Sequence, residues 1–478
     1  MSCREYLKDL QIRVEQSKNK GRYLVSERHI PAGTTIMTCK PLSFAITNEK
    51  EQFVCQNCFK EYPKLMTCAK CGYARYCCRQ CQVNDWKNHK LECGWMKKLM
   101  EKKQPMNSYV LIIRMVYQIC THQASHSNEN GIIKGDYTDI QDHCDNLNVS
   151  DKETVEKYKE VAELIHGLVL TESWYSETTC PLQEIVSCVG RLYSNRFSVT
   201  SYQNSDIAIG MYPLAYLINH RCTPNTTFVF DGDHMLVRSI ADIKKGEEIN
   251  ISYVDVTKPS YLRNQILHEG YCFRCSCSTC KDIQRDKNLL SYKCSCGGVL
   301  YPTIRNGYDR PELWICDKCG KSGYFADEKR LIEDEQCYSL LIWLQTDDGY
   351  SYKKTSELYT EYQSKCTTDN YLYIRLLQYL LTYFIALNRS MECEEISQTL
   401  LQFMNKYQIH YSRALIQENI SCGKLDSGLG KNLSAIKYYE EALKIARVTD
   451  GEGSAIFKII EGLISDVRMK IPQFMRRK

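Results

Sequence analysis

Cysteine and histidine residues between positions 55 and 93 have the spacing of metal ligands. They form four pairs in series: Cys55 with Cys58, Cys68 with Cys71, Cys77 with Cys81, and His89 with Cys93. Zinc prefers four tetrahedral sulfur and nitrogen ligands, and two closely spaced cysteines supply two sulfurs from one tight turn. The spacing predicts two zinc ions, one bound by the first and third pairs and the other by the second and fourth.

The composition favours zinc over disulfides at these positions. The chain has 27 Cys among 478 residues, and residues 1–6 are polar and charged, unlike a secretory signal. We therefore expect a cytoplasmic and nuclear protein, because thiols stay reduced there and then bind metal more often than they form disulfides. A disulfide cluster or a chance spacing is the alternative.

The charge and hydropathy patterns argue against a membrane protein and against a nucleic-acid-binding protein. The longest apolar stretch, residues 109–119, is interrupted by Arg114 and is too short to cross a bilayer. The formal net charge is +5, but basic residues do not form a dense stripe outside residues 476–478. We expect neither a membrane nor a specific nucleic acid as a partner.

A further group of four cysteines has the spacing of a zinc ribbon. These residues are Cys294, Cys296, Cys316 and Cys319. Each pair is followed by glycine, which permits the turned backbone that directs amide groups toward sulfur. Two such turns about twenty residues apart are typical of a structural zinc site, although the first pair is one residue shorter than usual. We predict a fourth zinc here, without a catalytic role.

The elements that must position these residues are strands in the first half of the chain and helices in the last third. Residues 21–47 and 206–255 contain short β-branched runs separated by turns, which predicts small antiparallel sheets. From residue 326 onward the pattern is helical, with apolar faces at helical spacing in residues 340–344 and 371–387. Residues 428–446 resemble a tetratricopeptide-type repeat, and a plain helical bundle is the alternative.

Three short segments reveal a family resemblance. They are Asn219-His220-Arg221-Cys222-x-Pro224-Asn225, Gly246-Glu247-Glu248-Ile249-x-Ile251-x-Tyr253 and Tyr271-Cys272-Phe273-x-Cys275-x-Cys277-x2-Cys280. In this order they resemble the SET domain of protein-lysine methyltransferases with its Cys-rich tail. The double-zinc segment resembles a MYND module, and a MYND module inserted into a SET domain is similar to the SET-and-MYND (SMYD) family. The resemblance covers roughly residues 15–282.

The resemblance implies an α+β fold with SET-domain sheets around a knot-like core. The domains that we expect are the N-terminal part of SET in 1–48, MYND in 49–97, a helical SET insert in 98–190, core SET in 191–256, a post-SET zinc region in 257–285, the zinc ribbon in 286–325 and a helical, TPR-like domain in 326–478.

The resemblance also implies which residues form the active site. The residues that correspond to S-adenosylmethionine contacts are Gly21, Arg22, Tyr23, His143, Asn195, Asn219, His220, Tyr253 and Phe273. Tyr253 matches the active-site hydroxyl of the family, and Tyr271 and Phe197 match residues that face the substrate lysine. Tyr253 and Tyr271 are therefore the expected catalytic residues. The third zinc would be bound by Cys222, Cys275, Cys277 and Cys280, a closed set that is typical of a structural site.

The chemistry explains why such residues are needed. Methyl transfer from a sulfonium to an amine requires alignment of sulfur, methyl and nitrogen, which is chiefly a positioning task. Lysine titrates near a pKa of about 10.4 in water, so the reactive neutral amine is scarce at pH 7. An apolar aromatic channel that ends at a cation lowers that pKa. Loss of the proton to water before transfer is the simplest route, because the sequence offers no obvious general base.

Two positions depart from the family pattern or have a second interpretation. The family usually has Gly-x-Gly at the cofactor loop, where the backbone must approach the ligand. Here the string is Gly21-Arg22-Tyr23, so the second glycine is replaced. His143 lies in the loosely matched insert, and a surface or core histidine is the alternative to a cofactor contact.

Two functions follow from this reading. The first is an active protein-lysine methyltransferase acting on histone tails or other lysine-bearing peptides. The second is an adaptor that keeps the fold without turnover and recruits partners through MYND and the helical domain. By family resemblance, heat-shock chaperones and proline-rich peptides are expected partners of those two modules. The retained site residues favour the enzyme, and the missing glycine favours the adaptor.

Overall fold

A computed structural model of the protein describes residues 3–18, 20–101, 106–121, 127–129, 132–134, 143–203, 205–323, 357, 359–387 and 389–471. Residues 326–356, the first part of the predicted helical domain, lie outside this description. The described chain has mixed α and β structure and divides into two compact units. The first unit comprises Met1–Asn219, Asn225–Ile251 and Gly270–Cys272, and the second comprises His220–Pro224, Ser252–Glu269 and Phe273–Lys478.

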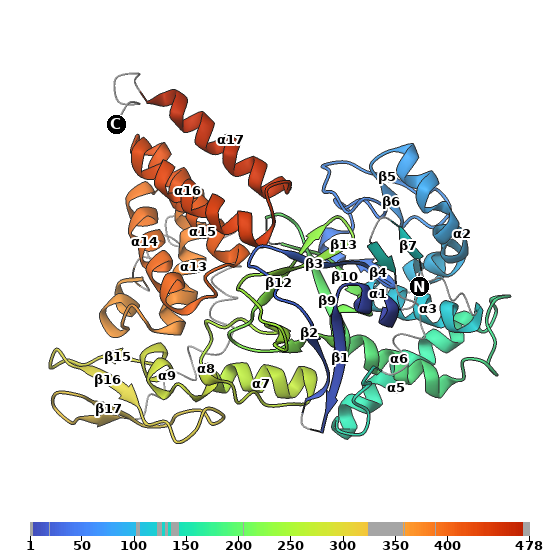
Figure 1. The fold of residues 1–478 in the computed structure, drawn as a ribbon, viewed down its shortest axis with the longest axis horizontal. Coiled ribbons are helices and arrows are strands. Elements are labelled where there is room, and N and C mark those ends of the chain that lie inside the picture. The colour runs from blue at the N-terminus through green and yellow to red at the C-terminus, as the bar shows by residue number, and fades with distance from the viewer. Residues whose placement is uncertain are drawn as a thin grey trace. The chain divides into compact units, whose positions relative to one another are not determined.

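The first unit contains most of the strands (Figure 1). Its elements are α1 (Cys3–Asp9), β1 (Ile12–Ser17), β2 (Gly21–Ser26), β3 (Thr35–Lys40), β4 (Ser43–Ile46), η1 (Asn48–Lys50), β5 (Met66–Thr67), β6 (Arg75–Tyr76), α2 (Arg79–Glu101), α3 (Met106–Thr121), β7 (Ser127–Glu129), β8 (Ile132–Lys134), α5 (Lys152–Val169), α6 (Leu182–Asn195), β9 (Arg196–Thr200), β10 (Asp206–Met211), η2 (Ala215–Leu217), the first residue of β11 (Asn219–His220), β12 (Thr226–Asp231), β13 (His234–Ser239) and β14 (Glu248–Ile251).

The sheets join segments that are far apart in the sequence. The strand orders are β1-β2-β14-β11, β4-β10-β9, β12-β13-β3-β8-β7 and β5-β6. Strand β2 pairs with β14 through Val25 opposite Glu248, and β3 pairs with β13 through Thr38 opposite Leu236. The regions before and after the Cys-rich segment therefore build the same sheets, as the two strand-rich regions of the sequence predict.

Two observations refine the expected insert at 98–190. Strands β7 and β8 lie within this stretch, and β8 pairs in parallel with β3 through Ile132 opposite Thr38. Helix α2 continues past residue 98 and α6 continues past residue 190. Helices therefore cross both ends of the stretch, and part of it adds strands to a sheet.

The Cys-rich segment and the helices of the first unit share one hydrophobic core. Trp95 and Leu99 of α2 pack with Ile112 of α3, Ile165 of α5 and Val189 of α6. Each of these helices buries residues at i, i+3 and i+4 spacing, which is the pattern of an amphipathic helix. The zinc-ligand segment is thus a packed part of this unit.

Arg114, which interrupts the longest apolar stretch, is used in the packing of α3. Its Nη2 donates to Oε2 of Glu92 at 2.8 Å, and its guanidinium lies 4.5 Å from the ring centroid of Phe44. It also donates to the carbonyl oxygen of Phe44. Because both side chains of the ion pair are largely buried, this cation links α3 to α2 and β4 rather than facing water.

The second unit contains short elements followed by a stack of helices. Its elements are most of α7 (Ser260–Tyr271), α8 (Ser278–Lys281), α9 (Ile283–Leu289), β15 (Tyr292–Lys293), β16 (Val299–Pro302), β17 (Trp314–Cys316), β18 (Ser322–Gly323), α13 (Tyr371–Ala386), α14 (Ser390–Tyr407), α15 (Arg413–Gly428), α16 (Asn432–Thr449) and α17 (Ala455–Lys470). We call α13–α17 the helical lobe. No helix among the described residues is long and apolar enough to cross a membrane.

Each helix of the lobe packs against the next helix along the chain (Figure 1). Gly423 of α15 permits the contact with α16, since a Cβ added there would lie 2.4 Å from the ring of Tyr439 in α16. The Gly428-Leu429-Gly430 string ends α15 and forms the turn before α16, with Gly430 at a φ of 76°. The predicted helix at residues 371–387 is confirmed as α13.

Glu418 in α15 makes the stability of the helical lobe depend on pH. Its Oε1 is buried without a hydrogen-bond partner among the described residues, and burial raises the pKa of the carboxyl from 4.5 to about 7. The folded state therefore holds the proton more tightly than the unfolded state, so stability falls as pH rises from about 4.5 through about 7.

We expect Glu418→Gln to stabilise the lobe at pH 8 by roughly 2–3 kcal/mol, because the neutral amide removes the cost of a buried charge. Urea unfolding at pH 5 and pH 8 measures the effect, which should be small at the lower pH. The matched control is Glu461→Gln at an exposed position of α17, which should leave both values unchanged. An equal gain at both pH values would contradict the assignment to ionisation.

Candidate active site and metal centres

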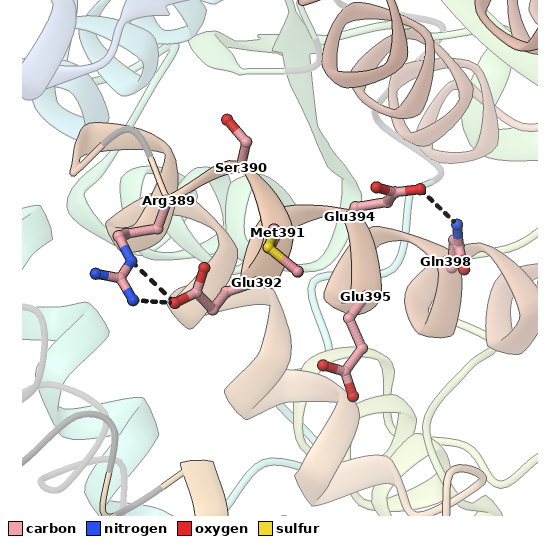
Figure 2. Close-up of a pocket in the computed structure, with 7 residues that line it drawn as sticks. All are labelled: Arg389, Ser390, Met391, Glu392, Glu394, Glu395 and Gln398. Atoms are coloured by element: carbon pink, nitrogen blue, oxygen red, sulfur yellow. Dashed lines mark hydrogen bonds and ion pairs between the residues drawn. The ribbon is translucent and has the colours of Figure 1, made fainter. Parts of the chain in front are cut away.

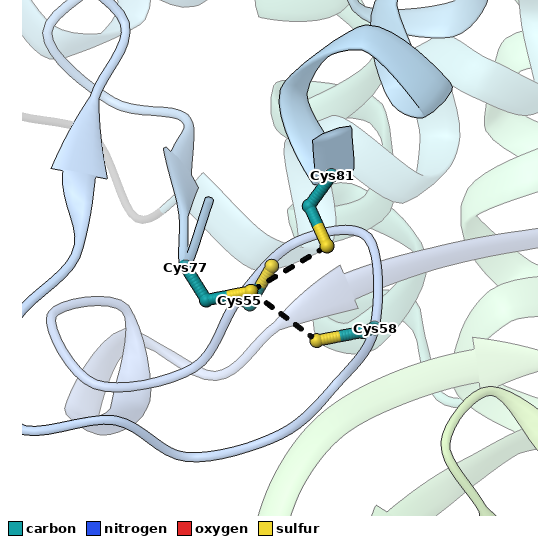
Figure 3. A group of neighbouring side chains, drawn as sticks. All are labelled: Cys55, Cys58, Cys77 and Cys81. Carbon is teal, nitrogen blue, oxygen red and sulfur yellow. Dashed lines mark hydrogen bonds between the residues drawn. The ribbon is translucent and has the colours of Figure 1, made fainter. Parts of the chain in front are cut away.

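The first metal-ligand group is built from two loops and the start of α2. Cys55 and Cys58 follow η1, Cys77 follows β6, and Cys81 lies in α2. Figure 3 shows the sulfur atoms directed toward one another, with Sγ of Cys77 3.5 Å from Sγ of Cys81 and 3.8 Å from Sγ of Cys58. Four sulfurs on one zinc ion at about 2.3 Å stand about 3.8 Å apart. The group therefore has the dimensions of a tetrahedral site.

The second group is fully buried and includes the only imidazole among these sets. Sγ of Cys68 lies 3.9 Å from Sγ of Cys93, and Sγ of Cys71 lies 3.7 Å from Nε2 of His89. Gly72 has a φ of 72°, and its N–H donates to the carbonyl oxygen of Cys68, which closes the turn. The structure thus brings together the pairs that the order of the ligands predicts, first with third and second with fourth.

The third group lies in the second unit beside α7. The ligand atoms of Cys222, Cys275, Cys277 and Cys280 all lie within 4.8 Å of one another. Nη2 of Arg263 donates to Sγ of Cys280 at 3.4 Å, and the N–H of Cys275 donates to Oδ1 of Asn264 at 2.7 Å. Arg263 and Asn264 are buried polar residues of α7 that the sequence pattern does not mark. The guanidinium offsets the negative charge of a thiolate set.

His220 connects this third group to the predicted catalytic tyrosine. Its Nδ1 accepts the backbone N–H of Tyr253 at 3.0 Å, and its Nε2 lies 3.3 Å from Sγ of Cys222. The first bond places the proton of a neutral imidazole on Nε2. Burial lowers the pKa of His220 to about 4, so the ring is neutral at pH 7.

The rings of His220, Tyr253 and Phe273 form a cluster in the second unit. The ring centroid of His220 lies 5.3 Å from that of Tyr253 and 6.1 Å from that of Phe273, and Tyr253 and Phe273 are 6.3 Å apart. Phe273 keeps 36% of its surface exposed, which is high for a phenylalanine in a packed cluster. An exposed aromatic face next to polar groups suits the binding of a planar ring.

A buried pair of asparagines ties two of the motif segments together in the first unit. The N–H of Asn225 donates to Oδ1 of Asn250, and the N–H of Asn250 donates to Oδ1 of Asn225. The amide of Asn225 also donates to the carbonyl oxygen of Glu248 at 2.8 Å. The segment that begins at Asn225 is therefore held against β14 by bonds that a truncation to alanine would leave unsatisfied.

Asn219 reaches the loop that precedes β2. Its Nδ2 donates to the carbonyl oxygen of Lys20 at 3.1 Å, and Nζ of Lys20 lies 2.6 Å from Oε2 of Glu248. Gly21 follows with a φ of 63°, which favours glycine, and no atom lies within 4 Å of an added Cβ. The predicted cofactor residues Asn219 and Gly21 therefore lie close together beside open space.

Tyr23, which replaces the second glycine of the family pattern, lies within β2 and is tied to β1. Its hydroxyl donates to Oε2 of Glu15 at 2.8 Å, and Nζ of Lys20 lies 5.3 Å from its ring centroid. The hydrogen bond to Glu15 raises the pKa of Tyr23. The tyrosine thus has partners on the neighbouring strand, which a glycine would lack.

Arg22 and His143, two further predicted cofactor residues, both contact Tyr216, which the sequence pattern does not mark as a site residue. The guanidinium of Arg22 lies 5.3 Å from the ring centroid of Tyr216, and the ring centroid of His143 lies 3.2 Å from that of Tyr216. Asn195 donates through Nδ2 to the carbonyl oxygen of Cys144 at 3.0 Å, which holds the chain next to His143. The position of Tyr216 in the turn just before Asn219-His220 is the one signal that points to it.

Tyr271 and Phe197 belong to the first unit. Burial raises the pKa of Tyr271, so its hydroxyl stays protonated at pH 7. The next residue, Cys272, has a φ of 58°, an unusual left-handed conformation for a non-glycine residue between two predicted site aromatics. Phe197 contacts Tyr212 and Phe228 with ring centroids 6.0 Å and 5.5 Å away.

A pocket of about 710 Å³ lies on the helical lobe at the start of α14. Figure 2 shows its lining: Arg389, Ser390, Met391, Glu392, Glu394, Glu395 and Gln398. Arg389 pairs with Glu392, and Met391 is 81% exposed. This pocket contains none of the residues that the sequence predicts for methyl transfer.

Comparison with known proteins finds a matching domain model and several relatives. The model of the SET domain matches residues 21–254. Histone-lysine N-methyltransferase SMYD3 is 26% identical in Mus musculus over 57% of this chain, and 26% identical in Homo sapiens over 60%. This chain spans 62% and 65% of the length of those two proteins. Histone-lysine N-methyltransferase ASHR1 of Arabidopsis thaliana is 22% identical, over 97% of this chain and 96% of that protein.

The matched residues 21–254 contain Gly21, Asn219, His220 and Tyr253, and the relatives named SMYD align with more than half of the chain. The two interleaved four-ligand groups at residues 55–93 lie within the stretch that matches the SET domain, as the sequence motifs predict. Residues 21–254 thus match the SET domain, and the chain is similar to proteins of the SMYD family.

Proposed function

We propose that the protein is an S-adenosylmethionine-dependent protein-lysine N-methyltransferase. The observation that carries this proposal is the cluster of His220, Tyr253 and Phe273 within a chain that matches the SET domain. The hydrogen bond from the Tyr253 N–H to Nδ1 fixes the ring of His220 relative to Tyr253. Its substrates are histone tails or other lysine-bearing proteins.

The residues proposed to bind the cofactor are Gly21, Arg22, Tyr23, His143, Asn195, Asn219, His220, Tyr253 and Phe273. When bound, S-adenosylmethionine supplies an electrophilic methyl group on a sulfonium. The chain around Gly21 fits a ligand that approaches the backbone, because the space there is open. The exposed face of Phe273 fits an adenine ring.

The tyrosines Tyr253 and Tyr271 are proposed to orient the substrate amine. A protonated Tyr271 hydroxyl, kept neutral by its raised pKa, accepts or donates a hydrogen bond without adding charge. His220 does not act as the base in this proposal, because its Nδ1 accepts a backbone N–H and its Nε2 is directed at Cys222. The lysine proton is therefore lost to water before methyl transfer.

Three zinc ions are proposed to hold this architecture. The groups at 55–81 and 68–93 form a MYND module, and Cys222 with the cysteines of 275–280 forms the post-SET site. Each group offers four ligands and leaves no open position for water, which is the arrangement of structural rather than catalytic zinc. The reduced thiols that these sites need agree with the predicted cytoplasmic and nuclear location.

The remaining modules are proposed to serve protein partners. Following the family, a TPR-like helical lobe would contact heat-shock chaperones, and the MYND module would bind proline-rich peptides. The successive packing of α13–α17 supports the first of these, since stacked helix pairs form extended binding surfaces.

Calorimetry with S-adenosylmethionine, followed by methylation of a lysine-peptide array read by mass spectrometry, tests the proposal. We expect saturable binding at one site and mass increases of one or more methyl groups on particular lysines. Absence of cofactor binding by a folded, zinc-loaded protein would replace the enzyme with the adaptor.

Tyr23→Phe tests the role of the tyrosine at the altered cofactor loop. The change removes the hydrogen bond to Glu15 but keeps the ring, so we expect the Kd for S-adenosylmethionine to rise about threefold with kcat unchanged. Tyr202→Phe, at an exposed turn, is the control. A loss of kcat with an unchanged Kd would show that Tyr23 acts in the chemical step instead.

A further inference from the structure

The cysteines near residue 300 form a fourth compact ligand set, in the second unit. Sγ of Cys294 lies 3.8 Å from Sγ of Cys319, and Sγ of Cys296 lies 3.5 Å from Sγ of Cys316. All four sulfur atoms lie within 4.8 Å of one another. These separations match those of four sulfurs around one zinc ion, which are about 3.8 Å.

The backbone around these cysteines is shaped for a bound ion. Gly297 and Gly320 have φ values of 80° and 66°, and their N–H groups donate to the carbonyl oxygens of Cys294 and Cys316. A Cβ added to Gly298 would lie 2.7 Å from Sγ of Cys316. The short first knuckle, with one residue between its cysteines, is thus accommodated by a second glycine that leaves room for the facing sulfur.

The sheet that carries the cysteines is too small to be stable in isolation. Strands β15 to β18 contain between two and four residues each, joined in the order β15-β16-β17-β18. Isolated strands of this length are marginal in water, and small modules of this kind usually depend on a metal or on docking.

This sheet is also docked on the start of the helical lobe. Tyr292 forms a β-bridge with Cys366, and Nε1 of the buried Trp314 donates to the carbonyl oxygen of Leu290 at 2.8 Å. Nδ2 of Asn370 donates to the carbonyl oxygen of Ser291 at 2.8 Å, and its Oδ1 caps α13. The N-cap residue of α13 therefore bonds directly to the segment that leads into β15.

We propose that Cys294, Cys296, Cys316 and Cys319 bind one structural zinc ion that orders β15–β18 and thereby fixes the start of the helical lobe. Zinc suits the site because four thiolates form a soft, closed tetrahedral set. Binding to a site that is absent from the unfolded chain adds its free energy to folding. This site does not depend on the proposed methyl transfer, since none of its ligands lies in the predicted active site.

Two of the ligands distinguish this site from the others. Cys296 and Cys319 are exposed, whereas the ligands of the three other groups are buried or half-buried. A chelator in solution therefore reaches this ion most easily, and we expect it to be the first that the protein loses.

Metal analysis of the full-length chain tests the proposal. We expect four equivalents of zinc in the parent protein, three in Cys319→Ser, and four in Cys144→Ser, whose exposed thiol lies outside all four groups. Three equivalents in the parent protein, or four in Cys319→Ser, would overturn the fourth site. Iron in place of zinc would overturn the assignment of the metal, and the visible absorption of an iron–thiolate centre would reveal it.

A second experiment uses the parent protein and two glycine variants with every cysteine retained. On partial chelation, hydrogen exchange should rise at residues 291–323 and at the start of α13, while residues 55–93 stay protected. Gly298→Ala should release this zinc to chelator at least tenfold faster, because the new Cβ meets Sγ of Cys316, whereas Gly323→Ala has open space and should match the parent. Loss of one zinc with unchanged exchange at α13 would refute the link to the lobe.

Discussion

Replacing Tyr253 by phenylalanine is expected to lower kcat for lysine methylation by about 10²-fold or more, while the Kd for S-adenosylmethionine stays within about twofold. The change removes one hydroxyl and keeps the ring. The ring contacts with His220 and Phe273 therefore persist, and so does the backbone N–H that His220 accepts. What is lost is the group proposed to orient the amine, and misplacement of a reacting atom by about 1 Å can cost a factor of this size.

Single-turnover kinetics and calorimetry on the same preparation separate the two effects. Tyr202→Phe is the control, since that exposed tyrosine contacts Gln203 at a turn and should leave both constants unchanged. An undiminished kcat would remove Tyr253 from the mechanism. A parallel loss of cofactor affinity and kcat would mean that the hydroxyl supports the cluster rather than the reaction.

The metal-ligand groups could be predicted from the sequence. Two cysteines separated by two residues are close in any fold, so the pairs are fixed locally. Which pair joins which follows from the serial order, and the structure brings together the groups that this order predicts. The strand-rich regions before and after residues 55–93 were likewise predictable, because their alternation and turns are local features.

The supporting residues could not be predicted, because their roles depend on contacts between distant segments. Arg263 appears in the sequence as an ordinary helix residue, and only the fold buries it beside Cys280. Tyr216 lies between Arg22 and His143, which come from segments about 120 residues apart in sequence. A single sequence carries no signal for such pairings.

Tyr23, which replaces a glycine of the family pattern, is a second case in which the sequence alone is insufficient. The family pattern suggests a defect in the cofactor loop, and this was the main support for an inactive adaptor. In the structure the glycine with positive φ is Gly21, which is retained, and Tyr23 adopts ordinary strand geometry with Glu15 as partner. The departure therefore no longer argues for loss of binding.

Cys275→Ser is expected to lower the rate of methylation by more than about 10²-fold and to abolish S-adenosylmethionine binding. The variant should contain one equivalent of zinc less than the parent protein. Zinc binding to sites of this type contributes about 10–16 kcal/mol to folding in small modules, so the segment around residues 272–281 should lose its order. This outcome differs from that of Tyr253→Phe, which keeps the cofactor.

The physical reason is the short chain of contacts from the metal group to the proposed site. Sγ of Cys222 lies 3.3 Å from Nε2 of His220, and His220 accepts the N–H of Tyr253. Without the zinc, Cys222 is no longer fixed, and the ring that orients Tyr253 and contacts Phe273 loses its support. Metal analysis, calorimetry and activity on one preparation check the prediction, with Cys144→Ser as control. Normal cofactor affinity and full activity in Cys275→Ser would show that this metal group is not what holds the site together.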